Sequence, residues 1–402
     1  MSQYLLLNRI KVQGANAVAG FTWGFPAITH FLGFTHNLSR KLKKQVEFAD
    51  IELSGCAVIA HHHQVHTYEY NQFVQSKNPA YLKKDVAKVN RGGSPSIIEE
   101  GKMDMEVSLL IECKGNIGNR HEALTQWLET VIQIQRLAGG SIFKIGNIGL
   151  YRIDEENKGN LRKLIRKLLP GFILQDRSSY LAEHFQHLQK KDSDAELFDA
   201  WLDFIALKQK ARPVNNLIHS HLNRLAESNS EDENAQKLFA LWLEHISPEN
   251  PYDSKQIPEE LINYFFDLPD DKQHKKLLIQ WRSYCHPDNK TDVVWGYIKK
   301  PRQGFLVPIM TGYKAISPVY KNKEVANTRD NKTDVCFVEA VHSVGEWQGV
   351  HHLREPQDLE QSIWCYHYEK NWYLCQQKRD QKQIPDETNE TIIEENPDND
   401  FS

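Results

Sequence analysis

The stretch Tyr4-Leu5-Leu6-Leu7-Asn8-Arg9-Ile10-Lys11-Val12 decides the fold class, because it is an apolar run of strand length at the start of the chain. A loop rich in Gly, Ala and Asn follows, and Pro26 then suits the first turn of a helix over residues 26–44. The apolar face of that helix, at helical spacing, consists of Ile28, Phe31, Leu32, Thr35, Leu38 and Leu42. A strand followed by an amphipathic helix predicts an α+β protein.

The same alternation continues through the first part of the chain. Strands are predicted at residues 51–63, 104–112 and 141–145, and a second helix at residues 121–137. The order is strand, helix, strand, strand, helix, strand. This order is typical of the split βαβ, ferredoxin-like (RRM-like) arrangement, which many RNA-binding modules share with proteins of other functions.

Further segments interrupt or extend this predicted core, which we assign to residues 1–191. A 40-residue excursion at 64–103 separates the second and third strands, and connections of that length are usually functional. Residues 192–290 are predicted to be a helical insert. Residues 291–384 return to short extended pieces that we expect to pack on the core. Residues 385–402 are too polar to bury anything and are expected to form a disordered acidic tail.

The composition excludes several classes of protein. The 402 residues are 40% hydrophobic, and no stretch approaches the roughly 20 apolar residues of a membrane helix. Six cysteines without a Cys-x-x-Cys pair predict reduced thiols in a cytoplasmic protein. The sequence lacks a phosphate-binding Gly-x-x-x-x-Gly-Lys loop, a Gly-x-Ser-x-Gly elbow and a His-Glu-x-x-His motif.

The net charge of −4 divides unevenly along the chain. The tail at 385–402 carries seven acids and no base, and residues 192–290 carry 18 acids and 11 bases. The remaining residues therefore have a net charge of +10. A basic body of this kind is suited to the phosphates of a nucleic acid, although Lys and Arg are also common on any protein surface.

Two basic motifs are candidates for phosphate contacts. Arg136-Leu137-Ala138-Gly139-Gly140-Ser141 ends the second predicted helix, and its glycines could turn the backbone and present N–H groups to a phosphate. The alternative is a helix C-cap before a strand. Arg162, Lys163, Arg166 and Lys167 lie on adjacent turns of another predicted helix, either as an RNA-backbone stripe or as a solvated face.

The run His61-His62-His63 with His66 is the sharpest metal-like feature. On a regular strand His61 and His63 would share a face, and two imidazoles at that spacing can bind zinc. A third ligand at close spacing is missing, so no metal site is predicted, and an exposed polar strand end is the plainer interpretation. A general acid–base role in RNA cleavage is a further alternative.

Many short motifs in order resemble the Csy-two family of type I-F CRISPR systems. The first are Leu5 to Ile10, Gln13 to Ala17 and Thr22-Trp23-Gly24-Phe25-Pro26. The others are Glu99-Glu100-Gly101, Glu106 to Leu110, Arg136 to Ser141, Arg166 to Phe172, Val307 to Ile309, Gly312 to Pro318, Asn327 to Asp330 and Val344 to Trp347. Residues 192–290 and the acidic tail are longer than this family leads us to expect.

The resemblance implies a RAMP protein of the Cas-five kind, with a ferredoxin-like core and a protruding thumb at 64–103. It implies a subunit that holds the 5′ handle of the guide RNA, pairs with the large subunit, abuts the first backbone subunit, reaches target DNA only through the complex, and is not an enzyme. The candidate RNA-binding residues are Asn16, Thr22, Trp23, Gly24, Arg40, Arg91, Arg136, Gly139, Gly140, Ser141, Arg162, Lys163, Arg166, Lys167 and Arg329.

Two questions stay open at this point. Trp23 could stack on a splayed base, or with Phe25 it could fix the helix start into the core. The alternative to a scaffold is a metal-independent ribonuclease that matures the guide with His61, His63 or His66, and a zinc hydrolase is a more distant option. No cofactor is predicted.

Overall fold

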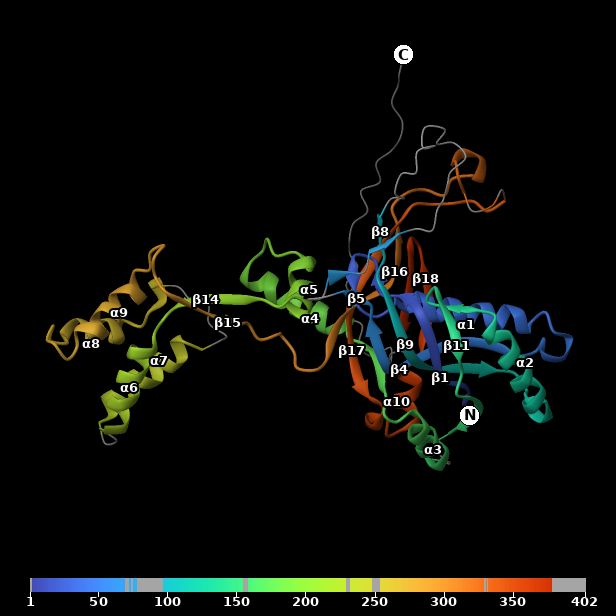
Figure 1. Ribbon diagram of the computed structural model, residues 1–402, viewed down its shortest axis with the longest axis horizontal. Coiled ribbons are helices and arrows are strands. Elements are labelled where there is room, and N and C mark those ends of the chain that lie inside the picture. Colours follow the sequence, from blue (N-terminus) through green and yellow to red (C-terminus); the bar gives the residue numbers. More distant parts are fainter. Residues whose placement is uncertain are drawn as a thin grey trace, which may run out of the picture. The chain divides into compact units, whose positions relative to one another are not determined.

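The computed structural model describes residues 2–68, 72–73, 75–77, 97–154, 158–228, 232–247, 254–328, 330 and 332–377. The chain divides into two units, a sheet unit of Met1–Arg177 with Pro308–Ser402 and a helical unit of Ser178–Val307 (Figure 1). Among the described residues, no helix is long and apolar enough to cross a membrane. The mixture of strands and helices confirms the α+β class.

Four long strands form the first half of the sheet, in the order β11-β1-β9-β4 with antiparallel neighbours. Their bounds are β1 Ser2–Asn16, β4 Glu52–Val65, β9 Lys102–Lys114 and β11 Gly140–Lys144. Helix α1 (Ile28–Leu42) joins β1 to β4, and α2 (His121–Gln133) lies between β9 and β11. The predicted order of strands and helices is therefore present.

The C-terminal strands extend the same sheet beyond β4. The order continues β4-β13-β17-β16-β19-β18, and β18 pairs back to β4 through Trp364 and Cys56. The bounds are β13 Phe172–Asp176, β16 Leu306–Ala315, β17 Val338–Gly349, β18 Trp364–Glu369 and β19 Trp372–Gln377. Distant parts of the chain thus meet at β4, the strand that pairs with β9, β13 and β18.

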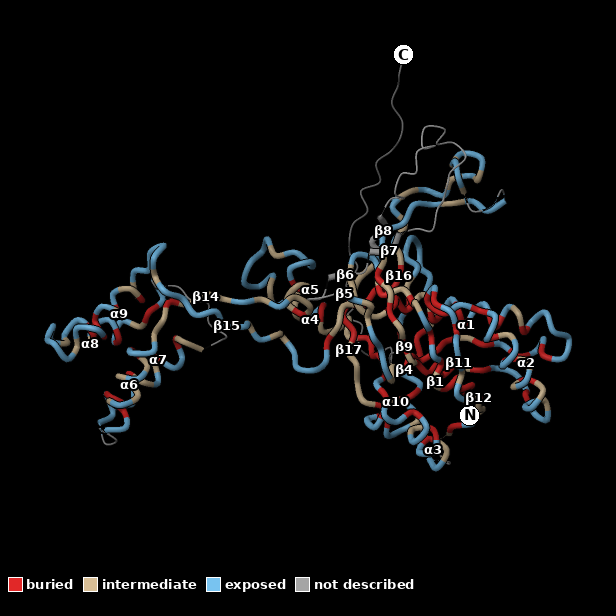
Figure 2. Tube along the Cα trace, in the orientation of Figure 1, coloured by how far each residue is buried: buried red, intermediate tan, exposed pale blue. Residues whose placement is uncertain are grey.

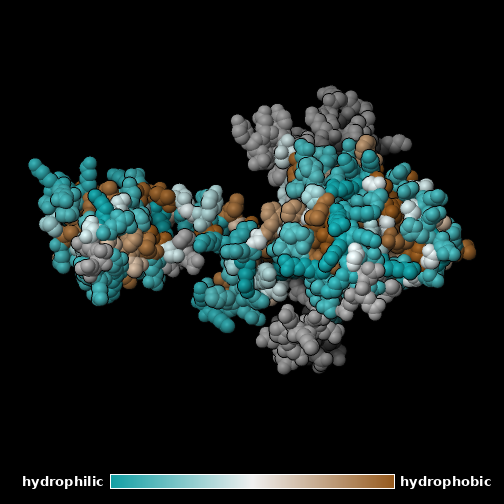
Figure 3. Space-filling view, turned by 90° about the horizontal axis from the view of Figure 1, so that it is seen from below, coloured by the Kyte–Doolittle hydropathy of each residue, from teal (hydrophilic) through white to brown (hydrophobic). Residues whose placement is uncertain are grey.

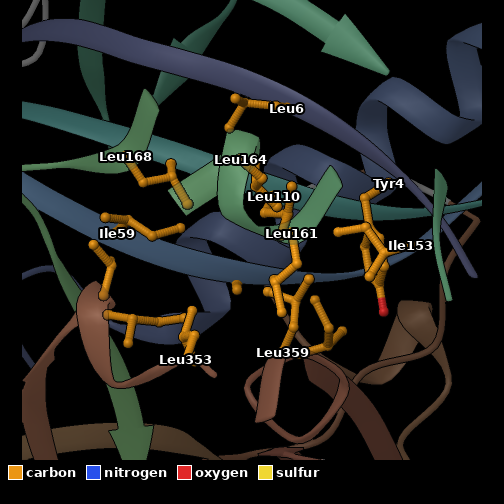
Figure 4. Close-up of a cluster of buried hydrophobic side chains, with 14 residues drawn as sticks. Tyr4, Leu6, Ile59, Leu110, Ile153, Leu161, Leu164, Leu168, Leu353 and Leu359 are labelled. Carbon is orange, nitrogen blue, oxygen red and sulfur yellow. The ribbon is translucent and has the colours of Figure 1, made fainter. Parts of the chain in front are cut away.

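Both faces of the first four strands are covered over part of their length, so consecutive residues from Tyr4 to Leu7 are all buried (Figure 2). Leu161, Leu164 and Leu168 of α3 (Lys158–Leu168) pack on Tyr4 and Leu6, which face one side (Figure 4). Helix α10 (Pro356–Gln361) adds Leu359 to this cluster. On the other side, α1 approaches β4, where Thr35 contacts Cys56.

The expectation that Arg136 and Leu137 end the second helix is wrong. Helix α2 ends at Gln133, and Arg136–Leu137 form strand β10, which pairs with β11. The buried Gln135 side chain accepts a 2.7 Å hydrogen bond from Asn37 Nδ2, which anchors the helix end against α1. Strand β12 (Asn147–Ile153) follows β11 and pairs with the first half of β1.

The helical unit carries a bundle on a two-stranded ribbon. Helices α4 (Ser178–Lys191) and α5 (Leu197–Ile205) precede β14 (Gln209–Pro213), which pairs antiparallel with β15 (Val293–Tyr297). Between the ribbon strands lie α6 Asn216–Ser228, α7 Glu233–His245, α8 Glu259–Asp267 and α9 Lys275–Cys285. Their core includes Trp242, Phe265 and Trp281, with the last two rings stacked 4.1 Å apart.

Only fragments of the excursion at 64–103 lie within the described residues. Two short antiparallel pairs are present, β5 (Thr67–Tyr68) with β6 (Gln72–Phe73) and β7 (Gln75–Lys77) with β8 (Ile97–Glu99). Arg91 and Arg329 lie outside the described residues, as does the tail at 385–402.

Candidate nucleic-acid interface

The sheet face that α3 packs against has a covered half and an open half. Strand register assigns residues to this face, because directly paired residues project to the same side. Asn16 pairs with Lys102, and Lys11 pairs with both Glu106 and Lys144. These residues continue the side of β1 on which Tyr4 and Leu6 meet α3, but beyond the end of that helix.

A buried polar network marks the boundary between the two halves. Ser108 Oγ lies 2.7 Å from His61 Nε2 and 2.9 Å from Asn8 Oδ1, and it accepts a 2.9 Å hydrogen bond from the Arg9 backbone N–H. Asn8 in turn donates to Asn147 Oδ1 at 2.9 Å. The network joins β1, β4, β9 and β12 at one level of the sheet.

The same network ties the end of α3 to the sheet. His61 Nδ1 lies 2.7 Å from the Pro170 carbonyl oxygen, and the Arg9 guanidinium donates to the Leu169 carbonyl at 3.1 Å. Burial lowers the pKa of His61 from its ordinary value, so the neutral ring is favoured at neutral pH. The Pro170 carbonyl can only accept, so a neutral imidazole donates from Nδ1, and its Nε2 then shares the single Ser108 hydroxyl proton with Asn8 Oδ1.

The open half of the face is rich in cations. Arg9 and Lys11 both pair with Glu106, at 2.6 and 3.4 Å. Burial raises the pKa of Glu106, but hydrogen bonds from Arg9 and Lys11 outweigh it and hold that pKa below its usual range. The described residues of this half include the cations Arg9, Lys11, Lys102, Arg136 and Lys144 and the acids Asp104 and Glu106, and Glu100 pairs with Lys102 at 3.6 Å. The surplus is positive, as a phosphate backbone requires.

The glycine-rich loop is a tight hairpin turn at the edge of this open half. Leu137 pairs with Gly140, and the two residues between them both have positive φ, 50° at Ala138 and 77° at Gly139. This is the pattern of a type I′ turn, so the glycine-rich segment turns the backbone, and the alternative of a helix C-cap is wrong. Gly139 is exposed, with open space where a Cβ would be, whereas Gly140 is buried.

Gly140 brings the loop against the first strand. A Cβ at this position would lie 2.6 Å from Val12 Cγ1 and 2.7 Å from the Ala15 nitrogen. The Asn16 backbone N–H also donates to the Ala138 carbonyl at 2.7 Å. The structure therefore places Asn16, Arg136, Gly139, Gly140 and Ser141 together, as one corner of the open face.

The segment after Asn16 is a small hairpin of β2 (Val18–Ala19) and β3 (Thr22–Trp23). Trp23 is half-buried, and a Cβ at Gly101 would lie 2.6 Å from its Cζ3 atom, so the indole packs on the Gly101 backbone. The Gly101 carbonyl accepts a 2.9 Å hydrogen bond from the Ala17 N–H, and the Gly24 N–H donates to the Ala17 carbonyl at 2.8 Å. Thr22, Trp23 and Gly24 are thus joined through Ala17 to Asn16.

Phe25 packs as a staple for α1. Its ring stacks on Phe31 at 5.5 Å and meets Trp347 of β17 edge-on at 4.8 Å. Both aromatic residues before the helix are half-buried, Phe25 against Phe31 and Trp347 and Trp23 against the Gly101 backbone.

All four cations of α3 project to solvent. Arg162, Lys163, Arg166 and Lys167 are exposed, while Leu161, Leu164 and Leu168 point into the sheet. Lys167 Nζ lies 5.8 Å from the centre of the Tyr151 ring. The helix ends at the boundary of the open face, so it extends the positive surface at the end opposite the corner formed by Asn16 and Arg136.

Arg40 is the described candidate that lies apart from this group. It is exposed in the last turn of α1, which packs on the opposite side of the sheet. The positive charge of Arg40 is favourable at the C-terminal end of a helix, and this stabilising role accounts for an arginine at this position.

The expectation that His61 and His63 share a strand face is wrong. The register of β4 with β9 shifts between Ala60 and His62, so His61 and His62 both project to the α3 side. His62 and His63 are exposed, and His66 pairs with Asp104 at 3.2 Å. Among the residues described, no group of three His, Cys, Asp or Glu side chains could hold a metal ion.

The geometry agrees with comparisons to known proteins. A family model described as CRISPR-associated protein (Cas_Csy2) matches residues 5–239 and 272–375. The chain belongs to the Csy2 family. The CRISPR-associated protein Csy2 of Pseudomonas aeruginosa (strain UCBPP-PA14) is 29% identical over 384 residues, which cover 91% of each chain. The resemblance stated from the sequence motifs is therefore confirmed.

The family model leaves one internal stretch of this Csy2-family chain unmatched. Residues 240–271 fall between the two matches, and they contain the end of α7 and all of α8. The ribbon strands β14 and β15 lie inside the matched segments.

Several cations of the open face were not singled out from the sequence. Arg9 and Lys11 stand within the first strand, and Lys102 and Lys144 lie about 90 and 130 residues further along. Their alternation with buried residues on each strand was the available signal, but only the register shows that they share a face.

Proposed function

We propose that this chain is a non-catalytic RNA-binding subunit of a type I-F CRISPR surveillance complex that holds the 5′ handle of the guide RNA. The observation that carries the proposal is the positive open half of the sheet face, bordered by the Gly139–Gly140 turn, the Trp23 hairpin and basic α3. Backbone contacts of Lys and Arg position a strand, and a partly accessible indole can stack on an unpaired base.

The fold assignment belongs to the same proposal. The strand order β11-β1-β9-β4, with α1 and α2 as the two connecting helices, supports a ferredoxin-like RAMP core. Residues 64–103 would be the thumb. In the complex, the subunit would pair with the large subunit and abut the first backbone subunit, and through them it would take part in target DNA recognition in the cytoplasm.

The contacts of His61 favour a scaffold over a ribonuclease. A general acid or base needs a ring nitrogen that can reach the substrate. Both ring nitrogens of His61 face protein atoms at 2.7 Å, the Pro170 carbonyl and Ser108. The competing function is metal-independent cleavage of precursor RNA by His61, His63 or His66.

The binding test uses labelled repeat RNA that contains the handle sequence and fluorescence anisotropy. Arg136→Gln combined with Lys144→Gln should weaken binding about tenfold or more, because two cations that would neutralise phosphates are removed. Lys272→Gln combined with Lys276→Gln, two exposed lysines of the helical unit, is the matched control. Equal loss in both double variants would contradict the proposed interface.

The cleavage test separates the two functions. Purified protein incubated with labelled precursor RNA should leave it intact over hours. RNA cleavage that disappears in His61→Ala or His63→Ala would establish the ribonuclease instead.

A further inference from the structure

The ribbon of the helical unit has a charge unlike that of the insert around it. Residues 206–213 and 293–303 contain six cations and no acid, whereas residues 192–290 as a whole have 18 acids and 11 bases. The six cations are Lys208, Lys210, Arg212, Lys299, Lys300 and Arg302. The acidic character of the insert therefore belongs to its helices and the loops between them, and the ribbon is basic.

These cations line two adjoining hollows within the helical unit. Lys210 and Arg212 line a hollow of about 230 Å³, and Lys208, Lys299, Lys300 and Arg302 line another of about 770 Å³. Ile298 lines both, so the two hollows adjoin at this residue. Gly296, opposite Lys210, has open space where a Cβ would be.

Existing contacts hold part of this cationic set in place. Lys208 pairs with Asp203, the acid that lines the larger hollow, and His184 also contacts Asp203 at 2.8 Å. Arg212 donates to the Ser247 carbonyl at 2.8 Å. Lys210 and Lys300 form no ion pair with any residue that the structure describes, so their charge is available to a ligand.

The other face of the ribbon is aromatic. Trp295 and Tyr297 alternate on β15, so they project to the same side. Their cross-strand partners are Ala211 and Gln209, which leave the rings 62% and 65% exposed. The face of this unit that Figure 3 shows is mainly hydrophilic, with several hydrophobic side chains among the polar ones. Two adjacent exposed rings on a narrow basic ribbon form a platform on which unpaired bases can stack.

We propose that the β14–β15 ribbon, with the following Lys299–Arg302 segment, is a second nucleic-acid-binding surface that takes a single strand of RNA or DNA. The six cations outnumber the acids that pair with them, Asp203 on Lys208 and Glu183 on Arg302, and this surplus favours a polyanion over a protein partner. The accessible aromatic faces favour unpaired bases over a duplex, whose bases are already stacked. This surface lies on a unit separate from the open sheet face, and its binding does not depend on the guide-handle function.

The test measures binding of the full chain to fluorescein-labelled 20-nucleotide oligothymidine, 20-nucleotide oligouridine and a 20-base-pair DNA duplex. Measurements are made in the Arg136→Gln, Lys144→Gln background, which weakens the open sheet face. Trp295→Ser with Tyr297→Ser should reduce single-strand affinity by about 5- to 150-fold. Lys210→Gln with Lys300→Gln should lower the slope of log affinity against log salt by about 1.4.

Matched controls lie on the same unit. Phe266→Ser removes a ring that is 85% exposed on α8, and Lys272→Gln with Lys276→Gln removes two other cations. Equal losses in ribbon and control variants would overturn the proposal. Unchanged affinity in the ribbon variants, or tighter duplex binding that survives loss of both rings, would also overturn it.

Crosslinking shows independently which residues contact the bound strand. A 4-thiouridine or 4-thiothymidine strand should crosslink to peptides within residues 206–213 or 293–303. If the RNA strand crosslinks more strongly than the DNA strand, the ligand of the ribbon is RNA, and the reverse result identifies it as DNA. Crosslinks confined to other residues, or capture only of a protein partner by this ribbon, would refute the single-strand site.

Discussion

His61 Nε2 lies 2.7 Å from Ser108 Oγ, and this contact joins β4 to β9 at the level where the covered half of the sheet face ends. Ser108 is fully buried and also meets Asn8 and the Arg9 backbone N–H. Buried polar groups with several partners specify one arrangement of the surrounding chain. The contact between His61 and Ser108 therefore determines where the open face begins and where α3 packs on the sheet.

Removal of the Ser108 hydroxyl should destabilise the sheet unit. Ser108→Ala leaves His61, Asn8 and the Arg9 N–H without one partner each, and a buried unsatisfied group costs about 1–3 kcal/mol. Urea unfolding should show a loss in that range. Ser141→Ala, at an exposed position, should change stability by less than about 0.5 kcal/mol. Equal effects of both changes would show that the network contributes nothing.

Stability should fall as the pH drops from 7 to 5. Burial lowers the pKa of His61, so the unfolded chain binds a proton at a higher pH than the folded chain does. The free energy of unfolding therefore increases with pH between 5 and 7, and the protein becomes less stable when the solution is acidified. His61→Gln should flatten the slope measured by urea unfolding at several pH values. His62→Gln, an exposed neighbour, should leave the slope unchanged.

The two glycines of the turn should respond differently to alanine. Gly139 has φ 77° in open space, so Gly139→Ala should cost about 1–2 kcal/mol of backbone strain. Gly140→Ala places a Cβ 2.7 Å from the Ala15 nitrogen and the Gln13 oxygen, so it should cost more, at least about 2 kcal/mol. Thermal unfolding of both variants checks the order. A larger loss at Gly139 would contradict the close approach of β11 to β1.

Sequence patterns predicted the elements of the sheet because burial imposes them. Strand β1 contains the apolar run Tyr4 to Leu7, and α1 repeats its apolar residues at helical spacing. The end of α2 was misjudged because Leu137 continues the apolar pattern, although its burial comes from strand β10. Ala138 has a positive φ, but alanine is not a residue type that indicates a tight turn. Residue types therefore could not predict the turn at this position.

The candidate site was only partly predictable for a similar reason. The basic stripe on α3 is local in sequence, so its pattern was visible. The open face is assembled from strands far apart in the chain, and two irregularities in β1 set which residues share it. The one-residue bulge near His61 likewise changes the side of the sheet to which the following histidines project. Residue types alone do not show this bulge.

The cations of α3 should contribute to the salt dependence of guide binding. Arg162→Ala with Arg166→Ala should lower the slope of log affinity against log salt by about 0.7 for each phosphate that is no longer neutralised. Both side chains are exposed, so the helix should keep its packing through Leu161 and Leu164. Anisotropy titrations with guide RNA at several salt concentrations give the slope. An unchanged slope would identify this stripe as a solvated face.

Trp23 should affect guide binding more than stability. Trp23→Leu keeps an apolar side chain against Gly101 and Val18 but removes the ring surface on which a base could stack. Guide affinity should then fall about 5- to 150-fold, while urea unfolding changes by little. Phe25→Leu is the matched control, because Phe25 packs between Phe31 and Trp347 and should lose stability with little effect on affinity. If Trp23→Leu behaves like Phe25→Leu, the indole serves only to hold the hairpin against Gly101.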